Sequence, residues 1–364
     1  RLRQRLAEAG VNDVSSDYRS LCRHLREIGS AEKLPSLSDC TSVERLPKAP
    51  TSSLRTPCVL PRQRLWPGRR WNSSFWRREY GAMSWKCRSR APLVESDLEN
   101  ASALDEVAEV AEFVDYMRVV QFHDASCEED QGLAFPRFLL FDWPVFYLAA
   151  EKLLESSWQS LGPPALKDYS HRWVKHWSCY SATPAPSELQ ARLYRICLAP
   201  PGGFVRLHRE NFGAHAWYTQ IEGRCVFFLF PPQGSHLSEE LSSWTGDPET
   251  ILDHAQASSP VDIFRPHRKQ HAKFGESKAR IAVLHPGEAL IIPGGWWSCH
   301  LSLESSVLLH HPFWNVSNRG GVADFVRHVI GAEHPQLSES DIIAQALDQF
   351  YERLMDDCDP EDSD

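Results

Sequence analysis

The chain is predicted to fold as a mainly β domain with flanking helices, an antiparallel sandwich or barrel, on three observations. Short apolar runs bounded by Gly and Pro follow one another from Leu193 to His311, as expected of successive strands joined by turns. Helix-like apolar spacing occurs before and after this region. Hydrophobic residues make up 42% of the 364 positions, enough for a sizeable core. The strand-like runs are LYRICLA, HAWYTQI, CVFFLFP, ARIAVL, EALIIP and SVLLHH.

Composition excludes several classes of protein. The net charge of −9 argues against a generally cationic nucleic-acid binder. No apolar run approaches the roughly 18 residues of a membrane helix, so we expect no membrane span. The ten cysteines include no C-x-x-C pair, which fits neither a zinc ribbon nor a dense disulfide framework. Reduced thiols, and hence the nucleus or cytoplasm, are favoured.

Composition also divides the chain into three parts. Residues 1–65 are expected to be an N-terminal helical appendage and linker, since residues 31–65 are rich in Ser, Thr and Pro and lack periodicity. Residues 66–335 are expected to form the main domain, with the barrel core at 190–315. Residues 336–364 are expected to be a C-terminal helix and an acidic tail.

The stretch 55–90 is basic and rich in tryptophan. It holds ten Lys or Arg and a single acid, Glu79. Basic residues between aromatics are compatible with a nucleic-acid surface, because phosphates attract cations and bases stack on flat rings. The alternative, which we favour, is that the aromatics pack into a core below a solvated basic face.

Helices are predicted on both sides of the strand-rich region. Apolar spacing predicts them over Leu104–Met117, Val145–Leu154 and Val322–Ile330. A further helix is expected from Ser338, where Ser-x-x-Asp341 is typical of a capping box. Its apolar stripe fits core packing or a homodimer through the C-terminal helices; the stripe residues are Ile343, Leu347, Phe350 and Leu354.

One pair of residues in the first strands carries metal-binding chemistry. His208 and Glu210 stand two positions apart, so in a strand an imidazole and a carboxylate project to the same face. His-x-Glu occurs often by chance, and either residue could instead form ordinary hydrogen bonds. The surrounding sequence decides between these interpretations.

The run from Leu198 to Trp314 resembles the JmjC branch of the cupin superfamily. The segments that carry the resemblance are LAPPGGFVRLHRENFGAHAWYTQIEGRCVFFLFPP, HPGEALIIPGGWWSCHLSLESSVLLHHPFWN and, further upstream, RWNSSFWRREYGAMSWKCRSRAP. The layout is most similar to JmjC proteins of the phosphatidylserine-receptor and asparaginyl-hydroxylase types. The resemblance covers roughly residues 66–335. It implies a double-stranded β-helix, the jelly-roll barrel, and oxidation of a protein or nucleic-acid substrate with Fe(II) and 2-oxoglutarate.

The resemblance implies a facial triad of two histidines and one carboxylate around iron. His208 matches the first ligand and Glu210 the second, which is usually Asp. The third normally follows the Trp pair, where this chain has Ser298. His300 comes two residues later and is the best remaining candidate, although a strand displaces it by about 6.6 Å. It can serve only if the strand slips or bulges.

The 2-oxoglutarate position also departs from the family. A Lys is expected two residues after the glycine of Q-x-x-G, where this chain has Cys225, and a Thr is often found at the position of Val205. We therefore assign cofactor binding to Arg224, Tyr218 and His215. Other side chains could face the same cavity; they are His300, His310 and His311.

Three functions stay open. The chain either resembles its family in hydroxylating or demethylating a protein side chain, or it is an inactive JmjC module, a pseudoenzyme that binds a protein as a scaffold. Ser298, Cys225 and Val205 favour the second, whereas the His208–Glu210 pair favours the first. A third option is a cupin that binds another divalent metal through this pair and a nearby histidine.

Overall fold

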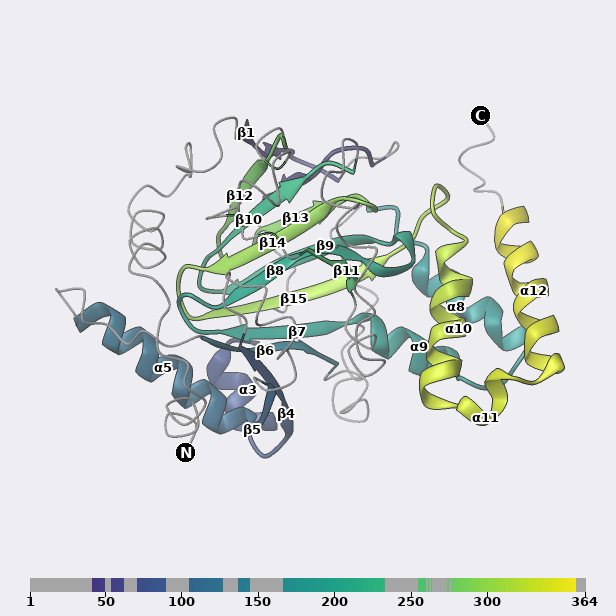
Figure 1. The fold of residues 1–364 in the computed structure, drawn as a ribbon, viewed down its shortest axis with the longest axis horizontal. Coiled ribbons are helices and arrows are strands. Elements are labelled where there is room, and N and C mark those ends of the chain that lie inside the picture. The colour runs from purple at the N-terminus through teal and green to yellow at the C-terminus, as the bar shows by residue number, and fades with distance from the viewer. Residues whose placement is uncertain are drawn as a thin grey trace.

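The computed structural model describes residues 41–49, 54–61, 71–89, 105–126, 137–144, 166–232, 255–259, 261, 263, 274 and 277–357. Its strands gather at the centre of the molecule, with helices on two sides (Figure 1). The strands are β1 Thr41–Ser42, β2 Glu44–Arg45, β3 Cys58–Leu60, β4 Ser84–Ser89, β5 Asp105–Glu109, β6 Phe138–Trp143, β7 Arg195–Ala199, β8 Phe204–Glu210, β9 His215–Glu222, β10 Cys225–Phe230, β11 Ala255–Ser258, β12 Arg280–Leu284, β13 Ala289–Ile292, β14 Trp297–Ser302 and β15 Ser306–Phe313.

Two sheets enclose the core of the barrel. One has the strand order β1-β12-β10-β14-β8-β11, and the other the order β2-β3-β13-β9-β15-β7-β6-β4-β5. Alternate residues of both sheets meet between them in one apolar cluster, to which Phe227 of β10 and Tyr218 of β9 belong. This arrangement is a cupin jelly roll, so the predicted fold class is confirmed. All six predicted strand runs are strands in the structure.

The segment predicted as a linker contributes to both sheets. β1 pairs in parallel with β12, and β3 pairs antiparallel with β13. Cys58, Val59 and Leu60 of β3 are all buried, so their short apolar run is a strand inside a Ser- and Pro-rich stretch. The composition of residues 31–65 was therefore misleading over this part, while residues 1–40 lie outside the described chain.

The helices lie in two groups (Figure 1). In the first, α3 and α5 pack on the outer face of the second sheet, where they share a core with β7 and β15. In the second, helices preceding the barrel pack against those that follow it. The helices are α3 Ser73–Tyr80, α5 Val110–Ser126, α8 Ser170–His176, α9 Pro186–Leu193, α10 Gly321–Glu333, α11 Pro335–Ser338 and α12 Asp341–Asp356.

Two helix boundaries differ from the predictions. The helix expected from Leu104 begins at Val110, because the five residues before it pair with β4 as strand β5. The last helix was expected from Ser338, but that residue ends α11 and the N-cap of α12 is Ser340, whose hydroxyl accepts from Ile343 N at 3.3 Å. The predicted helix Val145–Leu154 lies outside the described residues.

The apolar stripe of α12 is buried within the chain's own core. Its four residues are at most 5% exposed and pack with α8 and α10, Phe350 lying edge-on to Trp177 at 5.5 Å between ring centroids. The stripe is therefore not the free face that a homodimer would use. Association through other parts of these helices stays a prediction.

The tryptophans of the basic stretch serve the core. Trp71 and Trp76 are buried, and Trp85 donates its indole N–H to the carbonyl of Phe141 at 3.3 Å. Buried rings cannot stack on bases, so this favours the packing interpretation for Trp71 and Trp76, while Trp85 is partly buried against the same core. Among the described residues, no helix is long and apolar enough to cross a membrane.

Candidate functional site

A β-bulge aims His208 into the barrel. His208 lies opposite Ser298 of β14, whereas Val205 lies opposite His300, so three positions of β8 match two of β14. The bulge lets the His208 Nδ1 donate to the carbonyl of Arg206 at 2.8 Å, and Nε2 then faces the interior. A bulge that redirects a side chain is common beside functional sites, and such a bond fixes the ring as it does for metal-binding histidines.

Glu210 is the centre of a buried polar cluster. The Tyr218 hydroxyl donates to its Oε1 at 3.0 Å, and His310 Nε2 lies 3.2 Å from the same oxygen. His208 Nε2 is 3.8 Å away, beyond hydrogen-bond range. The rings of Tyr218 and His310 stack with centroids 4.4 Å apart and planes 5° apart. Three strands of two sheets, β8, β9 and β15, thus meet at one carboxylate.

Electrostatics keep the Glu210 carboxylate ionised. Burial alone would raise its pKa, but the charge of His310 and the interactions with His208 and His310 outweigh burial and lower the pKa well below the usual range. Oε2 is buried and has no hydrogen-bond partner among the described residues. The cluster therefore holds a buried anion with one oxygen unfilled.

The position of the expected third iron ligand is occupied by Ser298. It lies directly across from His208 and is 3% exposed. His300 points into the same interior, where its ring centroid is 4.8 Å from Phe227 and 5.9 Å from Tyr218. A bulge in β14 would be needed to bring His300 to the position of Ser298. The bulge lies in β8 instead, so His300 pairs with Val205.

The donors around His208 and Glu210 do not match what an iron site requires. Iron needs three donors that converge on one point. In the described residues, no group of three His, Cys, Asp or Glu side chains is arranged to hold a metal ion. Glu210 instead shares its Oε1 with Tyr218 and His310. A serine hydroxyl is a weak ligand for Fe(II), so the donor set does not fit a facial triad.

The expected 2-oxoglutarate position is neutral. Cys225 is buried, with its Sγ 3.5 Å from the Ser302 Oγ, and burial raises the pKa of its thiol despite hydrogen bonds to Ser302, Ser306 and Gln220. The thiol thus stays uncharged at neutral pH. None of these four buried side chains carries the positive charge that would bind a carboxylate.

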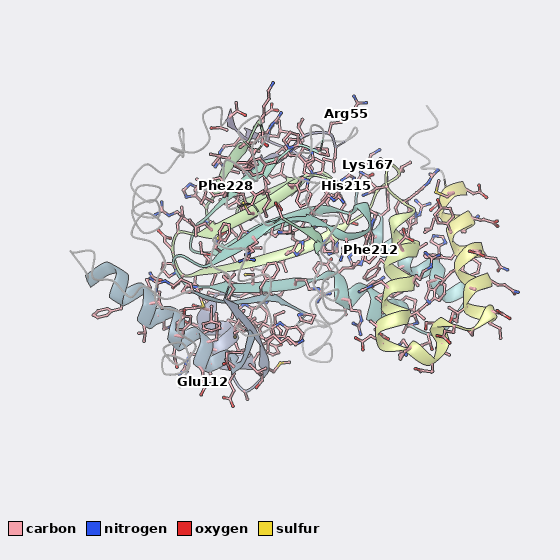
Figure 2. The ribbon with its side chains drawn as sticks, in the orientation of Figure 1. Arg55, Glu112, Lys167, Phe212, His215 and Phe228 are labelled. Carbon is pink, nitrogen blue, oxygen red and sulfur yellow. The ribbon has the colours of Figure 1, made fainter. Side chains whose placement is uncertain are left out.

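The residues assigned to cofactor binding are separated by the structure. Tyr218 lies in the interior cluster. Arg224 lies in the turn before β10 and pairs with Glu304 at 2.6 Å. His215 begins β9 on the face opposite Tyr218, where its Nδ1 accepts from Gly294 N at 2.7 Å. Figure 2 shows His215 near the end of the sheets that is closest to α10.

The remaining histidine of β15 belongs to a second buried cluster on the outer face. His311 Nε2 lies 3.0 Å from Asp168 Oδ2, and its Nδ1 lies 3.2 Å from the carbonyl of Leu193. Both ring nitrogens of His311 therefore lie against oxygen acceptors. The Tyr194 ring stacks on it at 4.4 Å. Strand alternation thus separates His310, which reaches Glu210, from His311.

Comparison with known proteins identifies the domain. Residues 145–314 match the family described as a cupin-like domain. The 2-oxoglutarate and iron-dependent oxygenase JMJD4 of Gallus gallus is 22% identical over 148 residues, 40% of this chain and 32% of that protein. The arginine-specific demethylase JMJ20 of Arabidopsis thaliana is 23% identical over 132 residues, 36% of this chain and 26% of that protein.

A third relative has a wider match. The lysine-specific demethylase JMJ21 of Arabidopsis thaliana is 28% identical over 162 residues, 44% of this chain and 16% of that protein. The chain therefore spans about a third of these relatives' lengths or less. Residues 145–314, which match the cupin-like family, include the strands β8, β9 and β15 that carry the Glu210 cluster.

Proposed function

Because the chain carries a cupin-like domain of the JmjC family, we propose that it is a non-catalytic JmjC module that binds a protein partner. One observation carries this proposal. Ser298 lies in register with His208, at the position from which a third iron ligand would have to come. The barrel, His208 and Glu210 are kept, while the family's third iron ligand and its 2-oxoglutarate lysine are replaced by Ser298 and Cys225.

The neutral 2-oxoglutarate position supports the same function. A lysine at this position would form a charge-assisted hydrogen bond with the distal carboxylate. Losing that bond costs about 1.5–3 kcal/mol, or one to two decades in affinity. Arg224 does not replace it, because its guanidinium pairs with Glu304. Weak co-substrate binding would thus add to weak metal binding.

A second candidate function follows from the relatives. JMJD4 is named as a 2-oxoglutarate and iron-dependent oxygenase, and JMJ20 as an arginine-specific demethylase. His310 lies 3.2 Å from Glu210, so a side-chain movement that places it beside His208 would supply a second imidazole. The chain would then oxidise a protein side chain, or bind another divalent metal through His208, Glu210 and His310.

Anaerobic titration with Fe(II), with and without 2-oxoglutarate, separates the two functions. The metal-to-2-oxoglutarate charge-transfer band is followed in the parent, in His208→Ala and in the double variant Ser298→His/Cys225→Lys. We expect no band in the parent and a band in the double variant, which regains both family side chains. A band in the parent that vanishes in His208→Ala would refute the non-catalytic proposal.

A further inference from the structure

The Glu210 cluster presents acceptors that no described side chain fills. Its Oε2 is buried without a hydrogen-bond partner in the described part of the chain. A carboxylate has about four lone-pair sites, and a buried oxygen without a donor is costly. Glu210 itself is only 5% exposed. Oε2 is therefore open to a hydrogen-bond donor that these residues do not supply.

His208 adds a second acceptor on the same side. Because its Nδ1 donates to the carbonyl of Arg206, Nε2 of the neutral ring is an acceptor. It lies 3.8 Å from Glu210 Oε1, so the two atoms do not satisfy each other. Ser298, opposite His208, has a much smaller side chain than the imidazole expected there. A ligand with several N–H donors can therefore form hydrogen bonds with both Glu210 and His208.

Flat rings stand beside these acceptors. Tyr218 and His310 stack with planes 5° apart, and the His300 ring lies edge-on to Tyr218 at 5.9 Å. A planar cation is stabilised over an aromatic face. A guanidinium matches this arrangement better than an ammonium, because it is flat and its five N–H donors form a fixed fork.

We propose that the Glu210 cluster binds a guanidinium group, the end of an arginine side chain on the partner protein, at the place where the family holds a metal. This deepens the proposed function and rests on it. The guanidinium donates to Glu210 Oε2 and towards His208 Nε2, and it lies against Tyr218. The guanidinium thus supplies the positive charge that, in the family, an iron ion held by three ligands supplies.

The probe is methylguanidinium, titrated into the full chain by calorimetry and ligand-observed NMR, with propylammonium as the comparison. We expect the parent to bind methylguanidinium more tightly than propylammonium. Glu210→Gln should weaken binding by about one to two decades, as for loss of a charge-assisted hydrogen bond. The matched control is Glu288→Gln, which removes a carboxylate paired with Arg45 in the turn between β12 and β13 and should leave binding unchanged.

A second variant keeps the test decisive if Glu210→Gln fails to fold. Ser298→Leu leaves the carboxylate intact but places an apolar branched side chain opposite His208, and it should also weaken binding. Equal binding of both probes, equal loss in Glu288→Gln, or no binding by the folded parent would overturn the guanidinium site. In the last case a silent Fe(II) and 2-oxoglutarate titration leaves the non-catalytic function standing, whereas a charge-transfer band refutes that function as well.

Discussion

Two histidines, the buried His215 and the half-buried His171, are predicted to make the fold lose stability between pH 7 and pH 5. Burial is the largest cause that lowers the pKa of His215 to about 4, and burial together with the charge of His311 lowers that of His171 to about 4. Geometry agrees for His215, because Gly294 N donates to its Nδ1, and an accepting nitrogen carries no hydrogen.

The sign and size follow from proton linkage. In the unfolded chain a histidine has a pKa of about 6.5. Below that pH the unfolded state therefore binds a proton, whereas the native state stays unprotonated at this histidine. Stability is therefore complete above pH 6.5 and is lost as the pH falls towards 4. At pH 5, with a native pKa of about 4, each histidine lowers the free energy of unfolding by about 2 kcal/mol.

Urea unfolding at pH 7 and pH 5 measures this loss, and His215→Asn isolates one histidine. Asparagine keeps an acceptor for Gly294 N but does not titrate. The parent should lose about 2 kcal/mol more than the variant between the two pH values. All other groups titrate in both proteins and cancel in the difference. Equal losses would show that His215 is protonated in the native state at pH 5 and would refute the reasoning.

Two more predictions concern packing around the barrel. Asp168→Asn removes the buried carboxylate that lies 3.0 Å from His311 Nε2 and should cost about 3–5 kcal/mol in urea unfolding. Asp115→Asn, which breaks surface pairs with Arg77 and Arg118, should cost much less; equal costs would contradict a buried pair at Asp168. Gly321→Ala would push a methyl group into the carbonyl oxygen of Phe212. It should lower the free energy of unfolding by about 1–3 kcal/mol and lower the melting temperature. An unchanged melting temperature would show that the backbone at Phe212 moves aside easily.

Phe212 shows why a glycine is needed at position 321. Its backbone is in the left-handed region, with φ of 55°, which is uncommon for a bulky residue. The strain is held by Trp314, whose indole N–H donates to the Phe212 carbonyl at 3.1 Å, and by packing on Phe325 of α10. Figure 2 shows Phe212 beside α10, directly after the strand that carries Glu210.

The sequence predicted those parts of the site that depend on local alternation. His208 and Glu210 share one face of β8 because residues two apart do so in any strand, and the structure places them there. The absence of a third ligand at Ser298 was also visible in the sequence. These inferences need only the positions of neighbouring residues along one strand.

The contact of His310 with Glu210 could not be singled out in the same way. It joins residues 100 positions apart, and it depends on how β9 and β15 pair, with Tyr218 opposite His310. A shift of one residue would turn His311 inwards instead. The sequence favours His300 as the third ligand, assigns Tyr218 and His215 to cofactor binding, and offers His310 and His311 only as further side chains that could face the cavity. The register of β9 and β15 is what brings Tyr218 and His310 together at Glu210.

Local composition failed where tertiary pairing dominates. The segment before α5 has a helical apolar pattern, but its pairing with β4 makes it a strand, because propensity is weaker than sheet packing. Cys58–Leu60 looked like part of a linker and is instead a buried strand beside β13. In both segments the partner strand lies outside the window that a local pattern covers.

The two faces of the barrel wall explain how the site could change while the fold persisted. On β14, Trp297 and Cys299 point outward into a separate apolar cluster, whereas Ser298 points inward. On β10, Val226 belongs to the same outer cluster and Cys225 to the inner one. Substitutions at inward positions therefore leave the outer packing intact. The outer apolar cluster can thus hold β10 and β14 in place whichever side chains face the interior.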